Sequence, residues 1–177
     1  MKRKTIPFPE FSLPILRSFH ERWMLLTAGQ NTPGGFNTMT VSWGGLGEMW
    51  NKPLAMVVVR PSRYTFEFME KHSDFTLSVL PGKFKDQLTL CGTRSGRTVD
   101  KVKATGLTPI PSSVVTAPGF DEAELILECR KMYYGDIEPS HFLAPHIEPN
   151  YNGRDYHRMY FGEIMAVQGI TAYTSAT

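Results

Sequence analysis

The segment LAMVVVRPSRYT, which spans residues 54–65, decides how the rest of the chain is interpreted. Its apolar half, residues 54–59, does not alternate between apolar and polar residues, which is typical of a strand covered on both faces. Pro61 then ends the pairing of that strand, and Ser62 is a favourable cap for a helix over residues 63–72. The segment therefore predicts a buried strand that leads directly into a short helix.

Strands dominate the sequence on both sides of this segment. Runs rich in β-branched and aromatic residues predict further strands over residues 22–28, 36–43, 74–80, 123–137 and 156–173. In the last run, bends or bulges are expected at Gly162 and Gly169. Other patterns predict helices over residues 84–91 and 98–104, a glycine-rich break at 44–47 and an irregular excursion at 140–151. The sequence thus predicts a mainly β fold, a β-barrel with a few peripheral helices.

Length and charge limit the possible classes of protein. The chain has 177 residues and a net charge of +2. We expect an N-terminal arm over residues 1–20 and a single domain over residues 21–177. Three of the 19 Lys and Arg residues lie at positions 2–4, so the remaining 16 face 17 Asp and Glu residues. A nucleic-acid-binding surface normally needs a basic patch across the domain, and we therefore expect no nucleic-acid partner.

Apolar runs and cysteines bear on the compartment. The longest strongly apolar run, residues 54–59, is too short to cross a bilayer, and the N-terminal residues lack the apolar stretch of a secretory signal. The two cysteines, Cys91 and Cys129, are far apart in sequence and indicate neither a disulfide framework nor a zinc ribbon. We expect no membrane contact and a cytoplasmic localisation.

Most sequence patterns of catalytic sites are missing. The dinucleotide-binding fingerprint fails because position 50 is Trp, and neither a nucleophile elbow nor an HExxH motif occurs. His141, His146 and Glu148 match no standard ligand spacing, so we expect no metal site.

One face of the strand predicted over residues 36–43 carries small hydroxyls. Side chains alternate along a strand, so Thr38, Thr40 and Ser42 point to the same side. Such a row suits hydrogen bonding to a flat polar heterocycle, and the alternative is an ordinary solvent-exposed face. The opposite side of the strand carries Asn37, Met39, Val41 and Trp43.

A candidate anion site follows at the start of the helix that Ser62 is expected to cap. Helix N-termini offer unpaired N–H groups, and Arg60, Ser62, Arg63 and Thr65 bring two guanidinium groups and two hydroxyls to the same turn. The alternative is a simple helix cap with a solvated arginine.

A second loop, SGRTVDK at residues 95–101, could complete that site. Gly96 allows a tight turn, and Arg97 and Lys101 are spaced to face the same side. Taken alone, this loop is more typical of a solvated helix start. Together with the first turn, Ser95, Arg97 and Lys101 could finish neutralising a phosphate.

The order of these motifs resembles the flavin reductase-like family with the FMN-binding split barrel, most nearly its flavoredoxin type. The resemblance rests on NTMTVSW (37–43), PLAMVVVRPSRYT (53–65), DFTLSVL (74–80), SGRTVDK (95–101), LEC (127–129) and YHRMYFGEI (156–164). It implies a Greek-key-like split β-barrel and an intertwined homodimer that binds FMN near the subunit interface.

The resemblance also implies roles for individual residues. The strand from Asn37 to Trp43, with Thr38, Met39, Thr40 and Ser42, would lie along the flavin ring. The phosphate would be held by Arg60, Ser62, Arg63 and Thr65, with Lys101, Ser95 and Arg97 at the same end. His157 would look over the ring where a nicotinamide stacks.

The implied function is a flavin reductase that passes reducing equivalents from NADH or NADPH through FMN to an acceptor, which could be free flavin or a redox protein. Because the flavin supplies the difficult chemistry, no catalytic triad or metal site is needed. One alternative is a flavoredoxin-like electron carrier without direct nicotinamide oxidation. Another is a barrel that binds a different anionic ligand.

Overall fold

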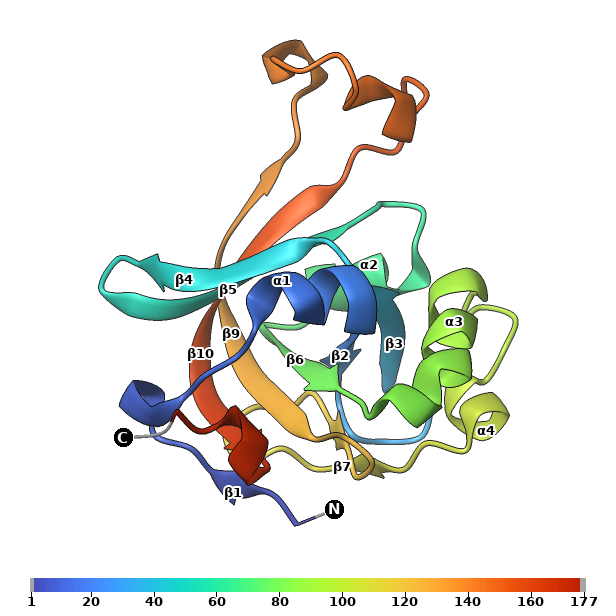
Figure 1. The fold of residues 1–177 in the computed structure, drawn as a ribbon. Helices are drawn as coiled ribbons and strands as arrows, with labels where there is room; N and C mark the ends of the chain where they lie inside the picture. The colour runs from blue at the N-terminus through green and yellow to red at the C-terminus, as the bar shows by residue number, and fades with distance from the viewer. Residues whose placement is uncertain (1, 176–177) are drawn as a thin grey trace.

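The computed structural model describes residues 2–175, and most of its strands form one antiparallel sheet (Figure 1). The strand order is β3-β2-β6-β9-β10-β5-β4, and β1 pairs with β10 outside this path. The strands of this sheet are β1 (Lys4–Thr5), β2 (Met24–Gly29), β3 (Phe36–Val41), β4 (Gly44–Met49), β5 (Lys52–Val59), β6 (Asp74–Val79), β9 (Leu125–Asp136) and β10 (Arg158–Gly169). A separate small sheet pairs β7 (Pro109–Ile110) with β8 (Gly119–Phe120).

The sheet is rolled into an open barrel because its two end strands are neighbours in sequence. β3 ends at Val41 and β4 begins at Gly44, yet they occupy opposite ends of the strand order. Three Cα–Cα steps span at most about 11 Å, so the two edges of the sheet must lie close together. Ser42 and Trp43 bridge this split between the edges.

The buried strand predicted over residues 54–59 is confirmed as part of β5. In β5, Leu54, Ala55 and residues 57–59 are all buried. β6 is also buried along its whole length, although its sequence alternates between apolar and polar residues. Its polar side is covered by the loop before β8, where the carboxylate of Asp74 accepts hydrogen bonds from backbone N–H groups of Thr116 and Ala117.

The break predicted at residues 44–47 is wrong, because these residues form most of β4. This strand pairs with β5 along its whole length, and the hairpin turns at Trp50 and Asn51, both with positive φ. Glycine is required at Gly44, where an added Cβ would lie 2.5 Å from the carbonyl oxygen of Met56. Pairing with a well-formed neighbour therefore outweighs the low strand propensity of glycine.

The helices lie at the periphery of the barrel (Figure 1). They are α1 (Ile15–Arg17), which continues into a π-helix (Ser18–Arg22), α2 (Tyr64–Lys71), α3 (Lys85–Thr93) and α4 (Lys101–Thr105). Short 3-10 turns occupy Phe8–Glu10, Gly82–Phe84, Pro139–His141, Glu148–Asn150 and Thr171–Tyr173. The predicted Ser62 cap is wrong: Arg63 is the N-cap residue of α2 and makes no side-chain cap bond. The helix predicted to start at residue 98 starts at Lys101 instead, and Asp100 caps its N-terminus.

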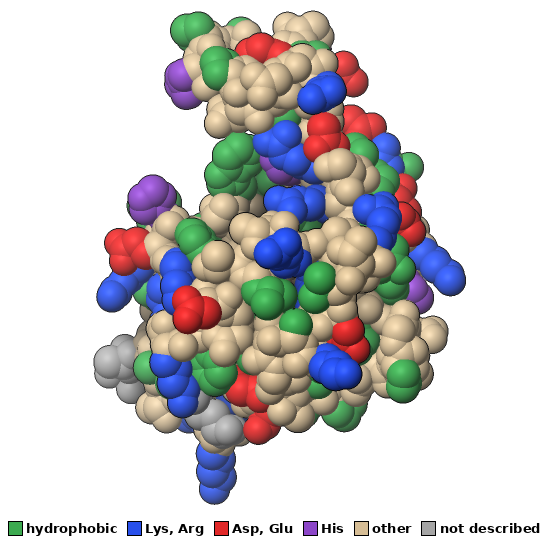
Figure 2. Space-filling view, turned by 90° about the vertical axis from the view of Figure 1, so that its right-hand side faces the viewer, with side chains coloured by type: hydrophobic (Ala, Val, Ile, Leu, Met, Phe, Trp, Pro, Cys, Tyr) green, Lys and Arg blue, Asp and Glu red, His purple; other side chains and the backbone are tan. Residues whose placement is uncertain are grey.

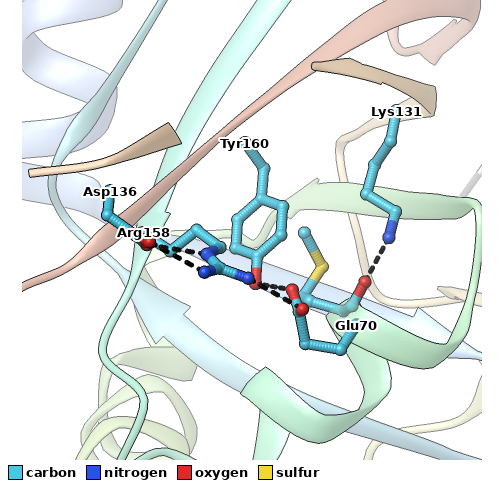
Figure 3. Close-up of polar contacts among 6 residues, drawn as sticks. Glu70, Lys131, Asp136, Arg158 and Tyr160 are labelled. Carbon is cyan, nitrogen blue, oxygen red and sulfur yellow. Dashed lines mark hydrogen bonds and ion pairs between the residues drawn. The ribbon is translucent and has the colours of Figure 1, made fainter. Parts of the chain in front are cut away.

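A polar network fastens the C-terminal half of α2 to the two longest strands (Figure 3). Glu70 accepts hydrogen bonds from Tyr160 at 2.6 Å and from Arg158 at 2.8 Å, and Arg158 makes a two-pronged contact with Asp136. Lys131 of β9 donates to a backbone carbonyl of α2. The helix that follows residues 60–63 is therefore held in place from its far end.

One segment projects beyond the barrel wall, and another runs along it. We define the excursion as residues 137–157, which connect β9 to β10. It projects from one end of the molecule and is irregular apart from two short 3-10 turns (Figure 1). At the opposite end, β1 runs along β10 and buries Ile6 in the main core. The register of β10 shifts at Phe161/Gly162, as predicted, whereas Gly169 is simply the last residue of the strand. No helix among the described residues is long and apolar enough to cross a membrane.

Candidate functional site

A cleft made of two adjoining hollows lies beside the turn between β5 and α2. We call the larger, of about 260 Å³, the arginine hollow and the smaller, of about 150 Å³, the tryptophan hollow. Met39, Arg60 and Arg63 line both hollows, which therefore adjoin each other. The arginine hollow is further lined by Ser62, Tyr64, Thr65, Thr93, Arg94, Ser95, Gly96 and Lys101. The tryptophan hollow is further lined by Thr40, Val41, Ser42, Trp43, Val58 and His157.

The local sequence explains why the arginines meet here. Arg60 follows the last residue of β5, and its carbonyl oxygen accepts a 3.0 Å hydrogen bond from the Arg63 N–H, which closes the turn before α2. Because α2 starts at Tyr64, the free N–H groups of its first turn lie next to the side chains of Arg63 and Thr65. The positive end of the helix dipole adds to the charge of the two arginines.

Backbone carbonyls hold both arginine side chains in place. The Nη2 of Arg60 donates to the carbonyl oxygen of Asn150 at 2.8 Å, and its guanidinium lies 5.0 Å from the ring centre of Tyr151. The Nη1 of Arg63 donates to the carbonyl oxygen of Gly92 at 2.8 Å. Arg60 is thereby linked to the excursion, and Arg63 to the end of α3. On the face shown in Figure 2, Lys and Arg side chains gather beneath the projecting excursion.

Lys101 contributes a buried cation to the same hollow. Its side chain is only 6% exposed, and Nζ donates to the carbonyl oxygens of Thr38 at 2.7 Å and Cys91 at 2.8 Å. Burial lowers the pKa of Lys101 to about 8, and the nearby charge of Arg63 acts in the same direction. An ammonium group has three N–H donors, so one remains for an anion in the arginine hollow.

One carboxylate stands opposite these cations. Asp155, at the end of the excursion, accepts hydrogen bonds from the Ser62 N–H at 3.0 Å and from the Ser62 hydroxyl at 2.6 Å. Its Oδ2 is also 4.0 Å from Nη1 of Arg60. Ser62 caps no helix, since Arg63 is the N-cap residue of α2, and both donors of Ser62 serve a side chain 93 residues away.

The tryptophan hollow combines two flat rings, Trp43 and His157, with apolar and polar side chains. Trp43 lies at the split of the barrel, is 46% exposed, and has its ring centre 5.2 Å from that of His157. The Nδ1 of His157 is 3.0 Å from the hydroxyl of Tyr151. Burial lowers the pKa of His157 to about 4, and the charges of Arg60 and Arg63 act in the same direction. The imidazole is thus neutral near pH 7.

The hydroxyl row predicted on β3 faces protein groups at two of its three positions. The Thr38 hydroxyl donates to the carbonyl oxygen of Leu26 at 3.2 Å, and the Thr40 hydroxyl donates to the carbonyl oxygen of Leu88. The covering helix α3 contains Leu88, and sequence periodicity gave no indication that a helix packs against this side of the strand. Ser42 lines the tryptophan hollow.

Three predicted site residues lie beside the cleft and not in it. Asn37, Thr38 and Arg97 line a neighbouring hollow of about 690 Å³, which shares Tyr64, Gly96 and Lys101 with the arginine hollow. Arg97 pairs with Glu67, and Asn37 donates to the Thr65 hydroxyl oxygen at 2.7 Å. The structure gathers the remaining predicted residues along the cleft: Met39, Thr40, Ser42, Trp43, Arg60, Ser62, Arg63, Thr65, Ser95, Lys101 and His157.

Sequence reasoning missed several residues of the cleft. Thr93 and Arg94 directly precede the predicted Ser95 loop, so their position in the sequence was the available signal. Asp155, which contacts Ser62 without lining either hollow, had no such signal, because this contact depends on how the excursion folds back. Among residues 2–175, no group of three or more His, Cys, Asp or Glu side chains could hold a metal ion.

Comparison with known proteins gives a consistent assignment. Residues 16–173 match the family described as flavin reductase like domain. A curated, uncharacterized protein of Pyrococcus abyssi is 32% identical over 84 residues, which cover 45% of this chain and 47% of that protein. The chain therefore matches this curated relative over about half of the relative's length.

Solved structures share the fold along most of the chain. Flavoredoxin from Methanosarcina acetivorans has a TM-score of 0.65 and 25% identity, covering 98% of this chain and 78% of that one. An FMN-binding domain of a flavin reductases-like enzyme from Shewanella baltica has a TM-score of 0.68 and 15% identity, covering 95% and 77%. An NADH:FAD oxidoreductase from Streptomyces globisporus has a TM-score of 0.63 and 17% identity, covering 86% and 77%. These similarities confirm the predicted split β-barrel.

Proposed function

The chain belongs to the flavin reductase like domain family, and from this premise we propose that its cleft binds FMN. The phosphate would lie in the arginine hollow and the flavin ring in the tryptophan hollow. The observation that carries this proposal is the convergence of Arg60, Arg63 and Lys101 on one small hollow.

The residues of the two hollows fit the two ends of FMN. A phosphate carries about −1.5 to −2 charges near pH 7 and accepts several hydrogen bonds, which matches two guanidinium groups, the spare donor of Lys101 and the first-turn N–H groups of α2. At the other end, Trp43, Met39 and Val58 offer apolar contacts to a flat ring system, beside polar groups that can hydrogen bond to its edge.

We propose that the bound cofactor accepts reducing equivalents from NADH or NADPH and passes them to an acceptor. FMN supplies the redox chemistry, and the protein binds it, orients it and excludes water. Arg63 and Lys101 neutralise the phosphate. His157, neutral because of its low pKa, can border the ring without placing a positive charge there. The NADH:FAD oxidoreductase among the structural relatives supports the nicotinamide step.

A second candidate function is electron transfer without nicotinamide oxidation. The flavoredoxin from Methanosarcina acetivorans supports this alternative, because it shares the fold over 98% of the chain. Under both candidates the chain would hold FMN through the same residues, so the two differ only in the source of electrons.

Two measurements test these proposals. The protein purified with added FMN should retain a flavin absorption spectrum after desalting or gain thermal stability from FMN; a protein that does neither contradicts FMN binding. Steady-state oxidation of NADH and NADPH then separates the two functions. Turnover above the rate of free FMN supports the reductase, and turnover no higher than that rate supports the carrier.

We also propose that two copies of the chain assemble around the cleft, and that they do so in the cytoplasm. Large aromatic side chains are exposed at Trp43, Trp50, Tyr133 and Tyr134, and the ring centres of Trp50 and Tyr133 lie 6.1 Å apart. Exposed apolar surface of this kind favours coverage by a partner. Both cysteines are free and buried, as is usual in a reducing compartment. Light scattering after gel filtration should give twice the mass of the chain; a monomer at micromolar concentration contradicts the dimer.

A further inference from the structure

Asp155 occupies both hydrogen-bond donors of Ser62, a residue that lines the arginine hollow. Each of its oxygens accepts one hydrogen bond from Ser62, at 3.0 Å from the backbone N–H and at 2.6 Å from the hydroxyl. The residue adopts a left-handed backbone conformation, with φ of 58°, which aspartate tolerates better than most residues. Its side chain reaches Ser62 from the excursion and not from the barrel.

The carboxylate of Asp155 makes the contacts with this turn that a bound phosphate would make. Two oxygens of one anionic group receive an N–H and an O–H, and the guanidinium of Arg60 lies 4.0 Å away. Ser62 has one proton on each donor, so neither can also serve a cofactor phosphate. Two anions beside the same turn would also repel each other.

We propose that Asp155 is an internal competitor of the cofactor phosphate, displaced from Ser62 when FMN binds. This inference rests on the proposed function. Displacement lowers the affinity for FMN and releases one attachment of the excursion, which also carries Tyr151 and is joined to Arg60 through Asn150. Asp155 thus favours a cofactor that exchanges over one that stays permanently bound.

The test compares FMN with riboflavin, which lacks the phosphate, on four proteins. These are the wild type, Asp155→Ala, Asp155→Asn and the control Glu48→Gln, which removes an exposed negative charge from β4. Affinities are measured by quenching of flavin fluorescence, and the melting temperature is measured without flavin.

We expect Asp155→Ala to bind FMN about tenfold more tightly than the wild type and riboflavin equally well. Asp155→Asn keeps one acceptor oxygen but no charge, so its FMN affinity should fall between the two. Without flavin, Asp155→Ala should melt at a lower temperature, because it loses two hydrogen bonds. A residue with a purely structural role would lower both the melting temperature and the FMN affinity.

Three results overturn the inference. FMN affinity that is unchanged or weaker in Asp155→Ala shows that the carboxylate does not compete, and leaves the proposed function intact if the wild type binds FMN. An equal gain for FMN and riboflavin, or the same gain in Glu48→Gln, shows that the effect does not involve the phosphate. Absence of FMN binding in all four proteins contradicts the proposed function itself, and the inference falls with it.

Discussion

The ammonium group of Lys101 donates a hydrogen bond of 2.7 Å to the backbone carbonyl of Thr38, which joins α4 to the middle of β3. Lys101 is one of few charged side chains that are almost fully buried, and a lone buried ammonium is costly unless it is paired or serves a bound anion. Its position next to Arg63 gives the arginine hollow a positive potential before any ligand enters. This relationship supplies the first three predictions.

Replacing Lys101 should weaken the phosphate end of the site selectively. We expect Lys101→Met to bind FMN at least roughly tenfold more weakly, because a charge-assisted hydrogen bond is lost, and to bind riboflavin as the wild type does. Lys103→Met, an exposed neighbour on the same helix, is the matched control. Fluorescence titration measures both ligands. An equal loss for FMN and riboflavin would assign Lys101 to the general integrity of the fold.

The affinity for FMN should depend on pH above about 8. Since the pKa of Lys101 is lowered to about 8, the free protein loses this charge as the pH rises, and the phosphate loses a partner. FMN should bind up to roughly tenfold more weakly at pH 9 than at pH 7, and the dependence should vanish in Lys101→Met. A wild-type affinity that stays constant to pH 9 would contradict this role.

The same shift predicts a stability change of opposite sign without FMN. The folded-state pKa of Lys101 lies below its unfolded value of 10.5, so the unfolded chain binds more protons between about pH 8 and 10.5. The contribution of this residue to the free energy of unfolding is therefore complete above pH 10.5 and is lost as the pH falls through 8. Urea unfolding of the wild type and Lys101→Met across this range isolates the contribution. Parallel curves for the two proteins would argue against a buried, titrating ammonium.

His157 should remain neutral well below the usual range of histidine. Burial, aided by Arg60 and Arg63, lowers its pKa to about 4 from 6.5, so the stability that it contributes is complete above pH 6.5 and is lost as the pH falls through 4. Its ring proton signals in an NMR titration, assigned with His157→Gln, should show a midpoint near pH 4. A midpoint near 6.5 would mean that the imidazole is open to solvent.

The network around Glu70 should stabilise the turn through the far end of α2. Tyr160→Phe removes the 2.6 Å hydrogen bond to Glu70 and leaves the buried ring in place, so we expect a loss of about 1–2 kcal/mol in the free energy of unfolding. Tyr133→Phe, on an exposed ring, should change that energy by less than about 0.5 kcal/mol. Urea unfolding measures both. Equal losses in the two variants would rule out a specific role for the Glu70 contact.

The features that sequence predicts well here are local ones. The strand over residues 54–59 and the helix after Pro61 follow from a continuous apolar run and a proline, and both are present. The convergence of Arg60 and Arg63 on one hollow was predictable for the same reason, since two residues separate them. Lys101 was predicted as a site residue from the loop motif and the family resemblance. The spacing of residues in the sequence did not predict that its side chain is buried.

Features that depend on distant contacts could not be predicted. β4 is a strand because β5 pairs with it, and this pairing overrides the low strand propensity of the glycines in GGLG at 44–47. The hydroxyls of Thr38 and Thr40 were assigned to one face correctly, but a periodicity cannot show that α3 covers that face. Ser62 resembles a helix cap in sequence and instead binds Asp155, because only the folded excursion brings that carboxylate near.

The most direct test of the central claim is a titration of the wild-type protein with FMN and with riboflavin under the same conditions. The cations of the arginine hollow predict saturable binding of one FMN per chain, with riboflavin bound at least roughly tenfold more weakly because it lacks the phosphate. Equal affinities for the two flavins, or no saturable binding of either, would contradict the account.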